Sequence, residues 1–176
     1  YGAASRVEHL TLVAFFALSA VIGPFVGQNL GAGQIDRIAT ALKISAAFCI
    51  SVGLAVAVAL AFGADSVMGL FGEAADVRAV GNTYLWIVPI SYGAYGIVMV
   101  VNAAFNGLGN PMPGVAISVT RILVLYVPLA ILGEKLFGIV GIFGAYAIAN
   151  ILSGALGYFW AKRSAHRLSQ LADATR

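Results

Sequence analysis

Charged side chains at the edge of an apolar stretch are the first candidates for chemistry in this sequence. Arg6, Glu8 and His9 precede an uncharged run from Leu10 to Ile35. Because Arg6 and Glu8 are two residues apart, they do not face each other on a helix, and each should meet a partner elsewhere. Glu8, with Arg6 beside it, is either an ion-coupling residue that binds a proton or a cation in a translocation cavity, or part of a water-facing helix cap.

A second group of candidates follows a helical spacing. Asn102 and Asn106 are four residues apart, and Tyr95 and Met99 precede them by one to two turns of the same face. Such a stripe could line a substrate cavity for aromatic cations, because the methionine sulfur is polarisable and the tyrosine ring face attracts positive charge. The alternative is that the asparagines form hydrogen bonds between helices.

Patterns typical of enzymes and metal sites are absent from the sequence. His9 and His166 are far apart, Cys49 is the single cysteine, and no Gly-rich phosphate loop or His-Glu-x-x-His motif occurs. The sequence therefore predicts no enzyme activity, no catalytic residue, no resident cofactor and no metal site. The net charge of +3 comes without an aromatic-basic patch, so nucleic acid is not an expected partner.

The composition indicates what must position these residues. Hydrophobic residues make up 61% of the chain, charged residues only 10%, and the mean hydropathy is +0.95. A soluble domain carries about a quarter of charged residues, whereas side chains that face a lipid bilayer can be apolar all round. The sequence predicts an all-α, polytopic integral membrane protein whose main partner is the lipid bilayer.

Charges and turn-forming residues divide the chain into five predicted transmembrane helices and a tail. The spans are at about 5–30, 40–64, 80–106, 114–133 and 138–161, within a bundle over 1–162, and a basic tail covers 163–176. Each span can cross a hydrocarbon core of about 30 Å at about 1.5 Å per residue. The prolines and glycines between Asn106 and Gly114 predict a loop, and Gly133–Gly138 predicts a short turn.

The distribution of lysine and arginine predicts the orientation. Seven of these residues fall on the side of the C-terminus and three on the other side: Arg37, Lys43, Arg121, Lys162, Arg163, Arg167 and Arg176 against Arg6, Arg78 and Lys135. The positive-inside rule therefore predicts a multi-pass protein of the cell (inner) membrane with a cytoplasmic C-terminus. Arg121 is expected to extend to the inner surface, and Asn150 and Ser153 are expected to contact neighbouring helices.

Three ordered segments resemble one transporter family. Val26-Gly-Gln-Asn-Leu-Gly-Ala-Gly-Gln-Ile-Asp-Arg37 is similar to the signature loop of the MATE (multidrug and toxic compound extrusion) transporters. Ser5-Arg-Val-Glu8 resembles an Arg-hydrophobic-Glu segment at the start of the same helix. Asn102-Ala-Ala-Phe-Asn-Gly-Leu-Gly-Asn-Pro111 resembles the loop after the tenth helix of that family. The order and spacing match from about Gly2 to Trp160.

The resemblance implies a fragment of a larger transporter. Family members have twelve helices in two bundles of six, so these five spans would be helices eight to twelve, and the N-terminal bundle of the same chain would be missing. The family exports cationic or amphipathic compounds, including drugs and other xenobiotics, in exchange for H⁺ or Na⁺. Some members carry an acidic residue on helix ten, but the nearest position here is Tyr95. Coupling is therefore expected to use Glu8 or carboxylates of the missing bundle.

Five residues near the connections are expected to act as hinge or loop residues. Pro24 should kink the inner half of the first helix, and Gly27, Gln28 and Gly31 belong to the signature segment, while Pro111 lies in the loop before the fourth span. Two other functions stay open at this point. One is a flippase for lipid-linked saccharides, which several arginines deep in the membrane would favour. The other is a membrane scaffold or channel subunit that does not transport.

Overall fold

The computed structural model of the chain describes the backbone of residues 2–70 and 75–174, and the side chains in these ranges except 2–7, 65, 67, 68, 70, 75–77, 169 and 171–174. The elements, in chain order, are α1 (Gly2–Gly31), α2 (Ile35–Leu70), α3 (Ala75–Ile87), the 3₁₀ helix η1 (Val88–Ser91), α4 (Tyr92–Gly107), α5 (Met112–Val119), the π-helix η2 (Thr120–Tyr126), α6 (Val127–Phe137) and α7 (Ile139–Ala174).

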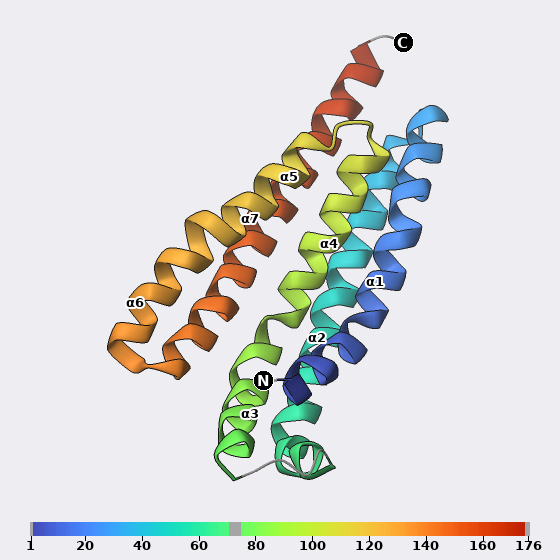
Figure 1. Cartoon of the computed structure of the whole chain (residues 1–176). Coiled ribbons are helices and arrows are strands. Elements are labelled where there is room, and N and C mark those ends of the chain that lie inside the picture. Colours follow the sequence, from blue (N-terminus) through green and yellow to red (C-terminus); the bar gives the residue numbers. More distant parts are fainter. Residues whose placement is uncertain (1, 71–74, 175–176) are drawn as a thin grey trace.

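These elements form five helical stretches that are long and apolar enough to cross a membrane. They are Glu8–Gly31, Ile35–Ala64, Arg78–Gly107, Met112–Phe137 and Ile139–Leu168. The described ranges contain helices, turns and no strand, so the expected all-α class with five spans is confirmed. Figure 1 shows that the C-terminal end of α7 lies at the same end of the bundle as the α1–α2 and α4–α5 connections.

The connections are shorter than the sequence predicts. The expected loop over 106–114 is present, but it covers only 108–111, because α4 continues to Gly107 and α5 begins at Met112. Pro111 is the N-cap residue of α5 and a second proline lies in its first turn, where a missing N–H leaves no intrahelical bond unmade. The predicted turn over 133–138 is likewise shorter: α6 extends to Phe137, and Gly138, with a φ of +61°, alone separates it from α7.

Close contacts between glycine backbones hold α4 in the centre of the bundle, where it packs against α1, α2 and α7. A Cβ atom on Gly53 of α2 would lie 2.3 Å from the backbone nitrogen of Gly93, and one on Gly107 would lie 2.3 Å from the carbonyl oxygen of Gly23 on α1. Helices in lipid commonly associate through such small residues, because apolar burial supplies no drive between them.

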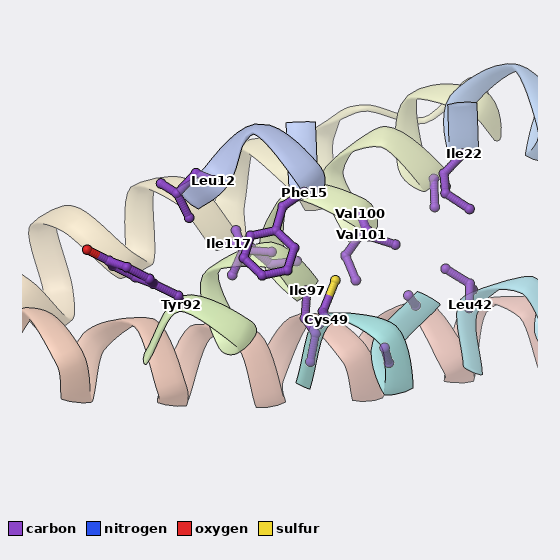
Figure 2. Close-up of a cluster of buried hydrophobic side chains, with 14 of the residues drawn as sticks. Leu12, Phe15, Ile22, Leu42, Cys49, Tyr92, Ile97, Val100, Val101 and Ile117 are labelled. Carbon is purple, nitrogen blue, oxygen red and sulfur yellow. The ribbon is translucent and has the colours of Figure 1, made fainter. Parts of the chain in front are cut away.

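A cluster of buried apolar side chains fills the space between these helices. Figure 2 shows Phe15 of α1 next to Cys49 of α2, and both side chains are fully buried. A Cβ atom on Gly96 of α4 would lie 2.8 Å from the Phe15 ring and 3.1 Å from the Cys49 sulfur. The bare backbone of Gly96 therefore leaves the space that both side chains occupy.

Two spans depart from the α-helix, and each does so next to a proline. In η1 the N–H of Tyr92 donates to the carbonyl of Pro89, three residues back. In η2 the N–H of Val127 donates to the carbonyl of Ile122, five residues back. Pro128 has no N–H to donate along the helix, and a π-turn of this kind is a common way to absorb the disruption.

The helices α6 and α7 form a tight hairpin. A Cβ atom on Gly141 would lie 2.0 Å from the carbonyl oxygen of Gly133, so the two backbones are in direct contact. Figure 1 shows this hairpin leaning away from α1 and α3 at the end of the bundle opposite the C-terminus. Residues of α7 that follow this hairpin, Ile142, Phe143 and Tyr146, line the cavity described next.

Candidate functional site

Glu8 is the centre of a hydrogen-bonded group that joins three helices. The Tyr84 hydroxyl of α3 donates to Oε2 of Glu8, and the Tyr146 hydroxyl of α7 donates to Oε1 at 3.3 Å. Both oxygens of one carboxyl group of α1 thus have a phenol donor. The structure places Glu8 against partners rather than only at a water-facing cap.

A cavity of about 90 Å³ opens beside this carboxyl group. Its lining residues are Glu8, Tyr84, Tyr126, Ile142, Phe143 and Tyr146. The aromatic walls are held in edge-to-face pairs: the ring centroids of Tyr84 and Phe143 are 5.1 Å apart, and those of Tyr126 and Tyr146 are 5.7 Å apart. The cavity is smaller than the roughly 300–1,000 Å³ of drug-sized sites, and its size suits a proton, a small cation or water.

The chemistry available here is the gain and loss of a positive charge. An ionised carboxylate only accepts hydrogen bonds, whereas a protonated one also donates, so protonation of Glu8 adds a donor and weakens the phenol contact at the oxygen that carries the proton. Among the side chains that the structure describes, no group of three or more His, Cys, Asp or Glu is placed to hold a metal ion. The Arg6 side chain lies outside the described residues, so its role stays a prediction.

The guanidinium of Arg121 forms a second polar centre, and the prediction that it reaches the inner surface is wrong. Arg121 lies in η2, roughly 14 Å along the helix axis from Met112. Its Nη1 donates to Oδ1 of Asn150 at 3.1 Å, and its Cζ lies 4.9 Å from the centroid of the Tyr95 ring. The side chain therefore turns toward neighbouring helices in the middle of the membrane-spanning region.

A chain of hydrogen bonds continues from Arg121 across the bundle. Nδ2 of Asn150 donates to Oγ of Ser91 at 3.1 Å, and Oγ of Ser91 donates to the carbonyl oxygen of Val88 at 2.8 Å. Asn150 and Ser91 are fully buried. The expectation of an interhelical contact by Asn150 is confirmed. For Ser153, which is fully buried, the hydroxyl donates to the Ala149 carbonyl of its own helix, so a contact with a neighbouring helix stays a prediction.

Two residues of the stripe on α4 contact η2 and α5, and none of the four lines the Glu8 cavity. Tyr95 lies under Arg121, and Nδ2 of Asn102 donates to Oγ of Ser118 at 3.0 Å. Met99 is half-buried against the apolar core, and Asn106 is exposed at the end of α4. Asn102 thus makes the interhelical bond that was the alternative to a substrate contact. Tyr95 contacts the charged guanidinium of Arg121, but the four residues of the stripe share no common partner.

The expected hinge and loop residues lie in or next to helices. α1 continues through Pro24 to Gly31, so the start of the signature segment is helical and the turn covers only 32–34. A Cβ atom on Gly27 would lie 3.3 Å from the Gly107 carbonyl oxygen, which makes Gly27 a packing residue. Gln28 is exposed and its carbonyl accepts the N–H of Ala32. A hinge at Pro24 stays a prediction.

Sequence reasoning missed the tyrosines of the Glu8 cavity. Tyr84, Tyr126 and Tyr146 lie on three different spans, within a few helical turns of one end of each. Their common signal was a hydroxyl at similar depth to Glu8, at the end of the bundle where α1 begins. Tyrosine at such a depth is also typical of a membrane interface, so the signal does not single them out.

Comparisons with known proteins agree with the fold and with the motifs. A family model described as MatE matches residues 1–132. The FAD transporter of Shewanella oneidensis (strain MR-1) is 36% identical over 163 residues, which cover 93% of this chain and 36% of that protein. The Vibrio cholerae MATE transporter VcmN in the bent form is 33% identical, with a TM-score of 0.87, and the match covers 94% of this chain and 38% of that one.

A more distant structure shows the same fold. It is the outward-facing conformation of a multidrug resistance MATE family transporter of the MOP superfamily, 21% identical with a TM-score of 0.89, and the match covers 96% of this chain and 38% of that one. The chain therefore spans little more than a third of the length of the relatives it matches. With three quarters of its residues matched by the family model and the whole bundle superimposable on solved members, the chain belongs to the MATE family of membrane transporters.

Proposed function

We propose that this chain is part of a secondary active transporter that exports a small amphipathic compound in exchange for protons or sodium ions, with Glu8 as a coupling carboxylate. Family membership supports transport, and the short coverage of the relatives supports a larger protein in which a second bundle completes the translocation cavity. In such two-bundle transporters, the bundles rock around a site near the bilayer midplane.

The single observation that carries the coupling proposal is the pair of phenol donors on Glu8. Tyr84 and Tyr146 bind opposite oxygens of this carboxyl group, so the ionised form connects α1, α3 and α7. Binding of a proton or Na⁺ competes with these contacts and thereby changes how firmly α7 is held against α1. Such a change at one carboxyl group is a physical route from ion binding to helix movement.

The substrate is proposed in two versions. Drugs and other cationic amphipathic compounds follow from the family as a whole. A flavin nucleotide follows from the relative named as an FAD transporter, which is 36% identical to this chain. The observation that favours the second version is Arg121, a positive charge in the middle of the spans, whose nearest described partners are neutral.

We further propose that the C-terminus is cytoplasmic and that the membrane is the inner membrane. Removing Arg121 from the count of surface charges, since it points inward, leaves six lysines and arginines on the C-terminal side against three on the other. The bias that the positive-inside rule needs is retained. In the complete protein, a reporter enzyme that works only in the cytoplasm should be active when it is fused after residue 176. A reporter that works only outside the cytoplasm should be inactive at the same position.

The proposal is tested with Glu8→Gln in the complete protein, reconstituted in proteoliposomes with an imposed gradient of H⁺ or Na⁺. We expect gradient-driven transport of ethidium or of FAD, whichever the wild type exports, to fall at least about tenfold, because an amide cannot take up and release the coupling ion. Glu134→Gln is the matched control, since Glu134 is exposed on α6 and does not line the Glu8 cavity. Unchanged coupling in Glu8→Gln would contradict the proposal.

The same proteoliposomes separate the other functions. A flippase would move a labelled lipid-linked saccharide between leaflets and leave ethidium and FAD untouched. A scaffold or channel subunit would show no transport that responds to the gradient. Either result in the wild-type protein would replace the exporter proposal.

A further inference from the structure

We infer that Arg121 forms a subsite for the anionic group of the transported compound, in the class of organic phosphates and carboxylates. The inference deepens the proposed transport function and rests on it. It follows from the position of the guanidinium, the chemistry of its partners and the way in which its orientation is fixed.

Arg121 carries its charge at a depth where the membrane is apolar. Its residue lies well inside the span Met112–Phe137, and its contacts, Tyr95 and Asn150, are themselves in the middle parts of their spans. A charged side chain at this depth costs free energy unless a partner or water compensates it. The depth also separates Arg121 from lipid phosphate groups, which lie at the membrane surface.

The described partners of Arg121 do not neutralise its charge. Asn150 offers an amide oxygen and Tyr95 an aromatic face, and both are uncharged. Nε of Arg121 is buried and has no hydrogen-bond acceptor among the described residues. Within the side chains that the structure describes, no carboxylate lies at salt-bridge distance from this guanidinium. An N–H donor of this kind binds an anionic oxygen more strongly than a neutral one.

The surroundings hold the guanidinium ready for such a ligand. Asn150 is itself fixed by its bond to Ser91, which in turn is fixed to the Val88 carbonyl in η1. The guanidinium also lies over the Tyr95 ring, with its Cζ 4.9 Å from the ring centroid. Arg121 is only half-buried, so part of the side chain is accessible. A planar, oriented and accessible guanidinium matches the geometry of phosphate and carboxylate oxygens.

The Glu8 cavity lies next to this subsite. Tyr146 is one turn before Asn150 on α7, and Tyr126 follows Arg121 at the other end of η2, so both aromatic walls continue from the cavity toward Arg121. A compound that carries both an aromatic ring and an anionic group therefore finds ring faces and a cation along the same helices. A purely cationic drug would be repelled by Arg121.

The test compares FMN with riboflavin, which share the ring system and differ by one phosphate. Both are fluorescent, so binding to the purified complete protein in nanodiscs is followed by titration. We expect the wild type to bind FMN at least about tenfold more tightly than riboflavin, the size expected for a charge-assisted bidentate contact. Arg121→Gln should remove this difference by weakening FMN alone, and Arg121→Lys should retain part of it.

Lys135→Gln is the matched control, because it also removes one positive charge, but at an exposed site of α6. It should leave both affinities unchanged. If the wild type binds FMN and riboflavin equally, binds neither, or if Arg121→Gln weakens both to the same extent, the inference is overturned and Arg121 is a structural link between η2 and α7. A thermal unfolding measurement on each variant identifies that structural role directly.

The two proposals fail in different ways. In one case, Arg121→Gln loses the FMN selectivity, but Glu8→Gln transports as the wild type does. This result would contradict the coupling role of Glu8 and support the anion subsite. Loss of coupling in Glu8→Gln with unchanged FMN selectivity in Arg121→Gln would do the reverse.

Discussion

The Tyr146 hydroxyl of α7 donates a hydrogen bond of 3.3 Å to Glu8 of α1, and both side chains line a cavity of about 90 Å³. Tyr84 binds the other carboxylate oxygen. Two neutral donors and one acidic group therefore connect the first, third and fifth spans at one end of the bundle. If Glu8 couples ion binding to transport, mutations that remove these two hydrogen bonds should affect the coupling most.

Replacement of either phenol by phenylalanine should weaken coupling while leaving the aromatic packing intact. A hydrogen bond to a charged group contributes about 1.5–3 kcal/mol, so we expect Tyr146→Phe and Tyr84→Phe each to lower gradient-driven transport at least about tenfold. Tyr126→Phe is the control, because the Tyr126 ring lines the same cavity and its hydroxyl makes no hydrogen bond among the described residues. Equal effects of all three changes would show that the hydroxyl contacts do not matter.

Addition of a single methyl group at the α2–α4 crossing should destabilise the bundle. A Cβ atom on Gly53 would lie 2.3 Å from the Gly93 nitrogen, whereas one on Gly31 meets no atom within 4 Å. We expect Gly53→Ala to cost about 1–3 kcal/mol and Gly31→Ala to stay within about 0.5 kcal/mol. Thermal unfolding of the complete protein in detergent compares the two, and a similar melting temperature would argue against the close crossing.

The bond between Asn102 and Ser118 should show a modest coupling energy. Interhelical hydrogen bonds in membrane proteins average about 0.6 kcal/mol in double-mutant cycles, and this bond is 3.0 Å long and half-buried. We expect that order of energy from a cycle with Asn102→Ala and Ser118→Ala, measured by reversible unfolding in mixed micelles. A coupling energy of zero would mean that the asparagine is free to contact a substrate.

The thiol of Cys49 should resist labelling in the folded protein. Its side chain is fully buried between Phe15 and Gly96, so a maleimide reagent can reach it only after the helices separate. In a form of the complete protein with its other cysteines replaced, we expect labelling only after unfolding in dodecyl sulfate. Ala32→Cys, in the exposed α1–α2 turn, is the positive control, and rapid reaction of native Cys49 would contradict the packing.

The spans could be predicted because the bilayer imposes a simple rule on charge and length. Most lysines and arginines fall near an end of a span or in a connection, whereas Lys43 and Arg121 lie further inside theirs, and the apolar runs have the length that the hydrocarbon core requires. The turns were predicted too long. Glycine and proline near Pro111 were read as helix breakers, although proline is compatible with the first turn of a helix.

The site was only half predictable for a different reason. The position of Glu8 at the edge of an apolar run was visible, but Tyr84 and Tyr146 are 76 and 138 residues away and no local period connects them to Glu8. The direction of Arg121 was also hidden, because it depends on the π-turn before Pro128 and on the amide of Asn150 in another helix. Depth can be read from one sequence, whereas facing direction depends on how helices pack.

Because only Gly138 connects them, α6 and the first half of α7 should move as one unit. There is no slack between the two helices, and their backbones touch at Gly133 and Gly141. Tyr126, the last residue of η2 just before α6, and Tyr146 of α7 lie on the two sides of this hairpin, and their rings are paired. If this hairpin moves relative to α1, both rings move together, and the hydrogen bond from Tyr146 to Glu8 is the contact that has to break.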